Sequence, residues 1–103
     1  MSITHLTRTR PVAAEWEGLS QEENDTKSAA IYNAVASNGG DMKYVAISPS
    51  GWNIVSVVEY PDDVSAKRGL AAVLALGTLE FDTVETLWDL TEWTGIQRAA
   101  QNG

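Results

Sequence analysis

A histidine near the start of the chain is the first candidate for chemistry. His5 is the only imidazole among 103 residues, and it alternates with Ile3 and Thr7 in a short segment typical of a β-strand. From such a strand it can project into a cavity between sheet and helices or between subunits, and act as a general base on a phenol-like or carbonyl substrate. Because no second ligand or nucleophile pattern accompanies it, a partly exposed histidine without a catalytic role is the favoured interpretation.

Glu59 is the second candidate for proton transfer. It directly follows the apolar run of residues 54–58, and a carboxylate at a dry strand end suits that chemistry. Asn53 falls on the same face of the strand and can orient a substrate oxygen. Pairing of Glu59 with Lys43 or an arginine across the sheet explains the carboxylate at least as well. The catalytic candidates are therefore His5 and Glu59, each with a structural alternative.

Aromatic side chains give the strongest hint of a binding site. The chain has four tryptophans, three tyrosines and one phenylalanine, which can wall a pocket for a flat apolar ligand. We expect Tyr44, Trp52 and Trp88, together with Asn53, to position such a molecule. Equally well, Trp52, Trp88 and Trp93 can serve the core and an interface between subunits, where amphipathic aromatic residues are enriched.

Composition argues against several other classes of function. Seven basic and fourteen acidic residues give a formal net charge of −7, so neither nucleic acid nor an anionic membrane surface is an expected partner. The chain has no cysteine, which fits a reducing cytoplasm and rules out a thiolate metal site. No secretory signal and no membrane-spanning segment is expected. Zinc spacing, nucleotide fingerprints and a serine triad are also missing, so we expect no metal and no cofactor.

The first part of the chain predicts a strand followed by a helix. Residues 3–8 have strand character, and residues 12–19 fit either one helical turn or an extended arm. A helix then begins at Ser20, where the sequence has the spacing of a capping box, or at Asp25. Asn38-Gly39-Gly40 supplies the left-handed stop that helices commonly need.

Two strands follow as a hairpin. In residues 42–48, alternation places Lys43, Val45 and Ile47 on one face and Met42, Tyr44 and Ala46 on the other. Residues 49–51 join this strand to residues 52–60, a strand whose two faces are both largely apolar. Such a strand is expected at the centre of a sheet.

A second helix and a last strand complete the pattern. Asp62 or Asp63 caps the helix, and Gly77 ends it. Residues 79–90 read as a strand whose apolar phase changes, as a bulge between residues 81 and 84 would produce. Residues 91–103 form a tail that can pack on a neighbour. The expected core stripe of the helix is Val64, Leu70, Val73 and Leu74, together with its alanines.

The order strand, helix, strand, strand, helix, strand predicts one ferredoxin-like α+β domain over residues 1–103, with a four-stranded antiparallel sheet and both helices on one face. This arrangement leaves the other sheet face bare. Because the central strand is apolar on both sides, we expect the same face of an identical chain to cover it, which makes the protein a homodimer.

Several short motifs carry a resemblance to a known family. They are Gly51-Trp52-Asn53-Ile54-Val55, Glu59-x-Pro61-Asp62-Asp63, Leu76-Gly77 and Asp82-Thr83, together with Leu6-Thr7 near the start. Residues 51–87 thereby resemble the GYD-domain family of the dimeric α/β-barrel superfamily, with Trp52 and Asn53 in place of the Tyr and Asp of the family name. The resemblance implies ferredoxin-like protomers that pair. Relatives in the superfamily include cofactor-independent monooxygenases, isomerases, stress-responsive proteins and ligand-sensing domains, and a shared fold does not choose between them.

Two hypotheses about function follow. The first is a protein that binds a small apolar or aromatic metabolite, acting as a cofactor-independent monooxygenase or isomerase in which His5 or Glu59 takes a proton. The second is a non-catalytic module for ligand binding or oligomeric assembly.

Overall fold

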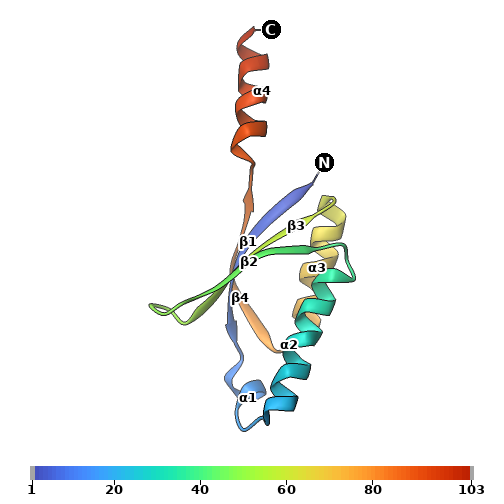
Figure 1. Ribbon diagram of the computed structural model, residues 1–103, viewed down its shortest axis with the longest axis vertical. Coiled ribbons are helices and arrows are strands. Elements are labelled where there is room, and N and C mark those ends of the chain that lie inside the picture. The colour runs from blue at the N-terminus through green and yellow to red at the C-terminus, as the bar shows by residue number, and fades with distance from the viewer. Residues whose placement is uncertain (1, 103) are drawn as a thin grey trace.

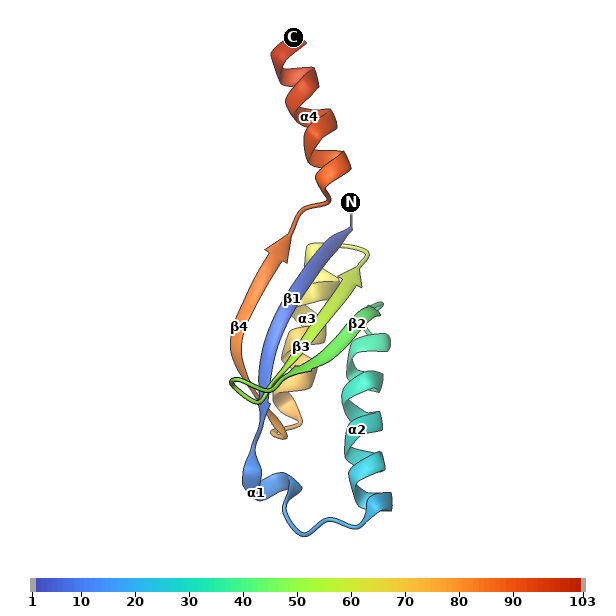
Figure 2. The same ribbon diagram turned by 60° about the vertical axis from the view of Figure 1, so that its left-hand side comes forward.

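The computed structural model describes residues 2–102, which form one antiparallel sheet of four strands and four helices (Figure 1). The sheet has the strand order β2-β3-β1-β4, and α2 and α3 lie together on one of its sides (Figure 2). This is the predicted ferredoxin-like α+β arrangement. The elements are β1 (Ile3–Pro11), α1 (Ala13–Trp16), α2 (Gln21–Ala36), β2 (Asp41–Ser48), β3 (Asn53–Tyr60), α3 (Asp63–Ala75), β4 (Leu79–Leu87) and α4 (Leu90–Asn102).

Side-chain caps fix where the two long helices begin. Ser20 Oγ accepts a hydrogen bond from the Glu23 backbone N–H at 3.1 Å, and Glu23 Oε1 accepts one from the Ser20 N–H at 3.2 Å. This capping box starts α2 at Gln21, so Ser20 and not Asp25 is the cap. Segment 12–19 contains the single helical turn α1. Gly39, with φ of +81°, follows the end of α2 in the left-handed conformation, as predicted.

Helix α3 begins at its expected cap but buries a narrower stripe than predicted. Asp62 Oδ1 accepts a hydrogen bond from the Ser65 backbone N–H at 2.7 Å. Val64 and Leu74 were expected in the core and are exposed. The reason is geometric: Ala66, Gly69 and Val73 are the buried residues, and on a helix of 3.6 residues per turn Val64 lies nearly opposite that stripe and Leu74 beside it.

A bulge in β2 changes which side chains share a face. Met42 pairs with Val58 and Tyr44 with Val57, so Lys43 is the extra residue. The predicted alternation, which put Met42 on the face of Tyr44, is therefore wrong at this point. The bulge turns Met42 toward the helices, where it lies on the same side as Val45 and Ile47.

The last strand has the predicted bulge but ends earlier than expected. The register of β4 against β1 shifts between the pairs Arg8–Thr83 and Thr9–Phe81, and this shift leaves Asp82 as the extra residue. The strand stops at Leu87 instead of continuing to residue 90. It stops because α4 begins there: Asp89 Oδ2 accepts a hydrogen bond from the Glu92 backbone N–H at 2.9 Å and caps this helix. Helix α4 extends beyond the end of β4, away from the sheet and the other helices (Figures 1 and 2).

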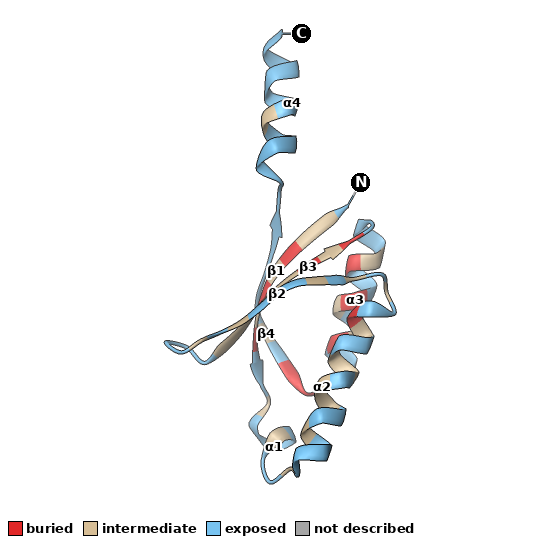
Figure 3. Cartoon of the chain, in the orientation of Figure 1, coloured by how far each residue is buried: buried red, intermediate tan, exposed pale blue. Residues whose placement is uncertain are grey.

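The apolar core between sheet and helices is small. Figure 3 shows buried residues on β1, β3, α3 and β4, and α2 also has one, whereas α4 has no buried residue. We call the sheet side turned away from α2 and α3 the open face. In the described part of the chain no helix is long and apolar enough to cross a membrane. The buried apolar residues are Val35, Val58, Tyr60, Ala66, Val73 and Leu79.

Candidate functional site

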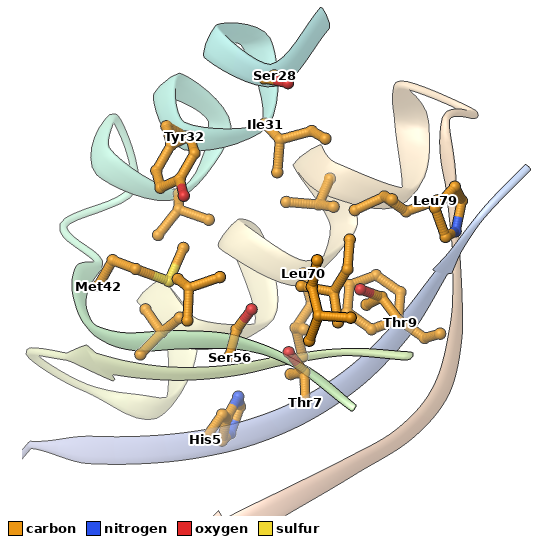
Figure 4. Close-up of a pocket in the computed structure, with 18 of the residues that line it drawn as sticks. His5, Thr7, Thr9, Ser28, Ile31, Tyr32, Met42, Ser56, Leu70 and Leu79 are labelled. Carbon is orange, nitrogen blue, oxygen red and sulfur yellow. The ribbon is translucent and has the colours of Figure 1, made fainter. Parts of the chain in front are cut away.

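A cavity of about 530 Å³ lies between the sheet and helices α2 and α3. Its size is within the range of about 300–1,000 Å³ that is usual for small-molecule sites. Most of its wall is apolar, with Ile31 of α2, Met42 of β2, Leu70 of α3 and Leu79 of β4 around it (Figure 4). The described residues that line it include no aspartate, glutamate, lysine or arginine. The cavity therefore suits an uncharged, mainly apolar molecule.

Polar side chains from the central strand form the cavity floor. His5, Thr7 and Thr9 alternate along β1 on the side facing the helices, and only 7%, 6% and 4% of each is exposed. Ser56 of β3 is the register partner of Thr7 and lines the same floor. Figure 4 shows these side chains rising from the sheet toward α2. Core positions of a central strand are normally apolar, so a polar row here points to a role beyond packing.

One buried atom on this floor lacks the partner that burial demands. His5 Nδ1 is enclosed and has no hydrogen-bond partner within the described residues. A buried polar atom left in this state costs about 1–3 kcal/mol. An imidazole nitrogen accepts or donates one hydrogen bond according to its protonation, so the arrangement can bind one polar group of a ligand.

Tyr60 stands beside His5 at this end of the cavity. The two ring centroids are 6.1 Å apart and the ring planes meet at 60°. Tyr60 is 3% exposed, and burial raises the pKa of its phenol, so the hydroxyl stays protonated and neutral at physiological pH. The cavity thus contains an imidazole and a neutral phenol within one apolar enclosure.

Helix α1 closes the cavity at the end of the sheet where β1 ends and β4 begins. Trp16 lines the cavity, and its Nε1–H donates to the Thr78 backbone carbonyl at 2.8 Å. Lys27 of α2 forms an ion pair with Glu15 of α1 at 3.0 Å. These contacts hold the short helix between the sheet and α2.

The structure separates the residues that the sequence suggested for the site. His5 lines the cavity. Glu59 and Asn53 lie on the open face of β3, as the expected common face requires, but that face is opposite to His5. The amide of Asn53 donates to Asp82 Oδ2, while Asp82 Oδ1 accepts from Arg10 Nε at 3.0 Å. Asn53 is therefore held by the bulge residue of β4.

The expected aromatic residues also lie outside the cavity. Tyr44 belongs to the open face, opposite Val57 in register. Trp52 was expected at the start of β3, but it sits in the preceding turn with φ of +53° and is 72% exposed. Trp88 follows β4, is 74% exposed, and stacks on Trp93 with ring centroids 5.2 Å apart.

Lys43 does not form the ion pair with Glu59 that was the structural alternative for this carboxylate. Its ammonium contacts Asp41 at 2.7 Å. The hydrogen bond and the charge of Asp41, followed by the charge of Glu59, raise the pKa of Lys43. Glu59 thus acts on Lys43 through its charge and not through a direct contact.

Sequence reasoning missed Trp16 and the hydroxyl row of Thr7, Thr9 and Ser56. A signal for the hydroxyl row was present: polar residues at every second position of β1 share one face with His5, and Ser56 interrupts an otherwise apolar strand. Trp16 had no such signal, since it lies in a single helical turn between two longer elements. Within residues 2–102 no group of three histidine, cysteine or acidic side chains gathers as a metal site would require.

Comparison with known proteins gives one similar structure. No protein-family model matches the chain, and no curated protein matches it. A solved structure, described as the crystal structure analysis of SCO4226 from Streptomyces coelicolor A3(2), is 12% identical with a TM-score of 0.48, over 79% of this chain and 91% of that chain. The strand order and register of this chain themselves define its fold.

Proposed function

We propose that this protein binds a small, uncharged and mainly apolar molecule in the cavity between the sheet and helices α2 and α3. The observation that carries this proposal is His5 Nδ1, buried without a partner among the described residues beside a mainly apolar cavity. A ligand with a flat apolar body and one hydroxyl or carbonyl group would satisfy that nitrogen while it fills the cavity. The neutral phenol of Tyr60 and the hydroxyls of Thr7 and Ser56 supply further hydrogen bonds to such a group.

Binding of Nile red, an uncharged fluorescent probe, tests the site. Ser28 of α2 lines the cavity, whereas Ala29 is exposed and does not. We expect Ser28→Trp to weaken Nile red binding about tenfold or more, equivalent to 1.4 kcal/mol, and the matched control Ala29→Trp to leave it unchanged. Equal effects of the two variants, or no saturable binding to the unaltered protein, would refute the proposal.

A pair of competitors tests the role of His5. Naphthol and methylnaphthalene have nearly the same shape, but only naphthol carries a hydroxyl that can hydrogen-bond to the imidazole. We expect naphthol to displace Nile red about tenfold better from the unaltered protein, and the preference to disappear in His5→Leu. A preference that survives this substitution would show that another group binds the hydroxyl.

Proton transfer by His5 is the second candidate function, and it would make the protein a cofactor-independent isomerase. It is favoured by the imidazole and the neutral Tyr60 phenol, which both line one mainly apolar cavity. In the conversion of a β,γ-unsaturated cyclic ketone to its α,β-isomer, His5 would take a proton from the α-carbon and return it to the γ-carbon. Tyr60 would donate a hydrogen bond to the oxygen of the intermediate. Oxidation by dioxygen, as in a cofactor-independent monooxygenase, could start from the same proton removal.

Metal-free protein should show this activity if the second candidate is right. The ketone isomerisation is followed by ultraviolet absorbance with the unaltered protein, His5→Gln and Glu59→Gln. Loss of turnover in His5→Gln alone supports the cavity as the active site, and loss in Glu59→Gln alone places it on the open face. Turnover that survives replacement of both residues would exclude either as the base.

We also propose that the protein self-associates through the open face of the sheet. Leu6, Val55 and Val57 form an apolar strip there, flanked by Tyr44. The resemblance to the GYD-domain family, whose superfamily members pair by such faces, supports the same arrangement. We expect light scattering to give the mass of a dimer for the unaltered protein and a lower mass for Val57→Asp; a monomeric mass for both would refute it.

A further inference from the structure

We propose that α4 is an arm that packs on a second copy of this chain, with Leu90, Trp93 and Ile96 as its contact residues. The inference rests on the self-association proposed above and not on the ligand cavity. The three residues follow one another at the spacing of a single helix face, and all three are exposed. No residue of α4 that the structure describes is buried. Because a helix of 13 residues is only marginally stable by itself in water, this face needs a cover.

The accessible surface and the radius of gyration of the chain indicate how much surface a partner could bury. Its accessible surface is 6844 Å², whereas a folded monomer of this mass exposes about 5,700 Å². The difference, about 1,200 Å², exceeds the share of about 800 Å² that each partner buries in a standard interface. The radius of gyration of 16.2 Å also exceeds the value of about 13 Å for a compact domain of this length. Both excesses fit a protomer shaped for association.

The apolar face of α4 is continuous with the open face of the sheet. A hollow of about 610 Å³ is lined on one side by Leu90, Trp93 and Ile96, and on the other by sheet residues that include Thr4, Glu59 and Leu87. In the β1 register, Thr4 faces Glu59 on one side and Leu87 on the other, so all three belong to the open face. A partner seated on the open face therefore also meets the inner side of the arm.

Charge identifies that partner as a second copy. Arg8 and Glu85 lie on the open face in adjacent rows of the sheet, and within the part of the chain that the structure describes neither forms an ion pair. A two-fold axis that passes between these two residues would bring each Arg8 close to Glu85 of the other copy, so that the surface would complement itself. A lipid surface does not fit, because helices that lie on membranes are rich in Lys and Arg, and α4 carries a single Arg98 opposed by Glu92.

The test compares two aspartate substitutions in α4. Ile96 lies on the apolar face, whereas Thr91 is exposed and lies about 160° around the helix from Trp93, on the polar side. Sedimentation of the full-length protein over a range of concentrations gives the dissociation constant of the dimer. We expect Ile96→Asp to raise it about tenfold or more, Ile96→Ala to raise it less, and the control Thr91→Asp to leave it unchanged. Because α4 contributes nothing to the core of its own chain, these variants should keep the far-ultraviolet circular dichroism of the sheet.

Each outcome decides a separate point. A dimer that is equally stable in Ile96→Asp and in the unaltered protein overturns the arm contact and leaves the open-face dimer standing, as do equal effects of Ile96→Asp and Thr91→Asp. A protein that is monomeric at all concentrations overturns both. Hydrogen exchange provides a second readout: the amides of α4 should be protected in the dimer and lose that protection in Ile96→Asp, and amides that are unprotected in a stable dimer would refute the contact.

Discussion

Close approach of α3 to the sheet makes Gly69 a sensitive position. A Cβ atom at residue 69 would lie 2.4 Å from the Tyr60 hydroxyl, 2.6 Å from Cε1 and 2.7 Å from Cζ, well inside van der Waals contact. Tyr60 is enclosed, so its ring cannot move aside without disturbing His5 or entering the cavity. Overpacking of this kind costs about 1–3 kcal/mol, while the higher helix propensity of alanine returns about 1 kcal/mol. We expect Gly69→Ala to lower the free energy of unfolding by about 1 kcal/mol.

Urea denaturation of a double-mutant cycle separates the two effects. In a Tyr60→Leu background the overlap is removed, so Gly69→Ala should there stabilise the protein by about 1 kcal/mol through helix propensity alone. The coupling between the positions is then about 2 kcal/mol. If Gly69→Ala stabilises the unaltered protein as much as it stabilises Tyr60→Leu, the contact between α3 and β3 is not as close as we describe. The same variant should weaken Nile red binding, because a displaced Tyr60 ring occupies the cavity.

Three further substitutions test the cavity floor, a helix cap and a strained turn. His5→Leu should raise the free energy of unfolding in urea by about 1 kcal/mol, since it removes a buried nitrogen without a partner; a loss of stability would mean that His5 is satisfied in the free protein. The hydrogen bond from Ser65 lowers the pKa of Asp62 in the folded chain. The carboxylate therefore stabilises the fold fully at pH values above its pKa in the unfolded chain, and this stabilisation is lost as pH falls through the lower pKa of the folded chain. Asp62→Ala should therefore lower the thermal midpoint at pH 7, and the deficit should shrink in acid; a deficit independent of pH would contradict this. Trp52→Asn should stabilise the chain by about 0.5 kcal/mol in thermal unfolding, because asparagine tolerates positive φ better than tryptophan; weaker self-association in this variant would instead show that Trp52 contacts a partner.

Much of the fold was predictable because its boundaries are set by local interactions. The capping box at Ser20, the cap at Asp62 and the left-handed Gly39 act within one turn of the chain, so the sequence itself displays them. The bulge at Asp82 was also visible, as a change of apolar phase. The bulge at Lys43 was not, because the residues on either side of it are apolar in both registers and the pattern fits a regular strand equally well.

Which face of the sheet the helices cover could not be read from periodicity. In β3 the helix-facing set includes Ile54 and Val58 and the open set includes Val55 and Val57, so the two faces are nearly equal in apolar content. Candidates from both faces were therefore grouped into one site, and the structure places only His5 in the cavity. Deciding between the faces requires the crossover geometry of the whole chain, which is a tertiary property.

The structure leaves two surfaces whose physical requirements the single chain does not meet. On the helix side, His5 Nδ1 lacks a partner in an apolar cavity; on the other side, the open face and α4 expose apolar residues to water. Within the described residues, Ala66 is the one core side chain with no exposure at all, so intramolecular packing is thin for a chain of this length. A ligand would complete the first surface and a second copy the second, and each would stabilise the folded chain by mass action. Because the sheet is shared by both surfaces, a ligand in the cavity would contact the same strands that present the open face to a second copy.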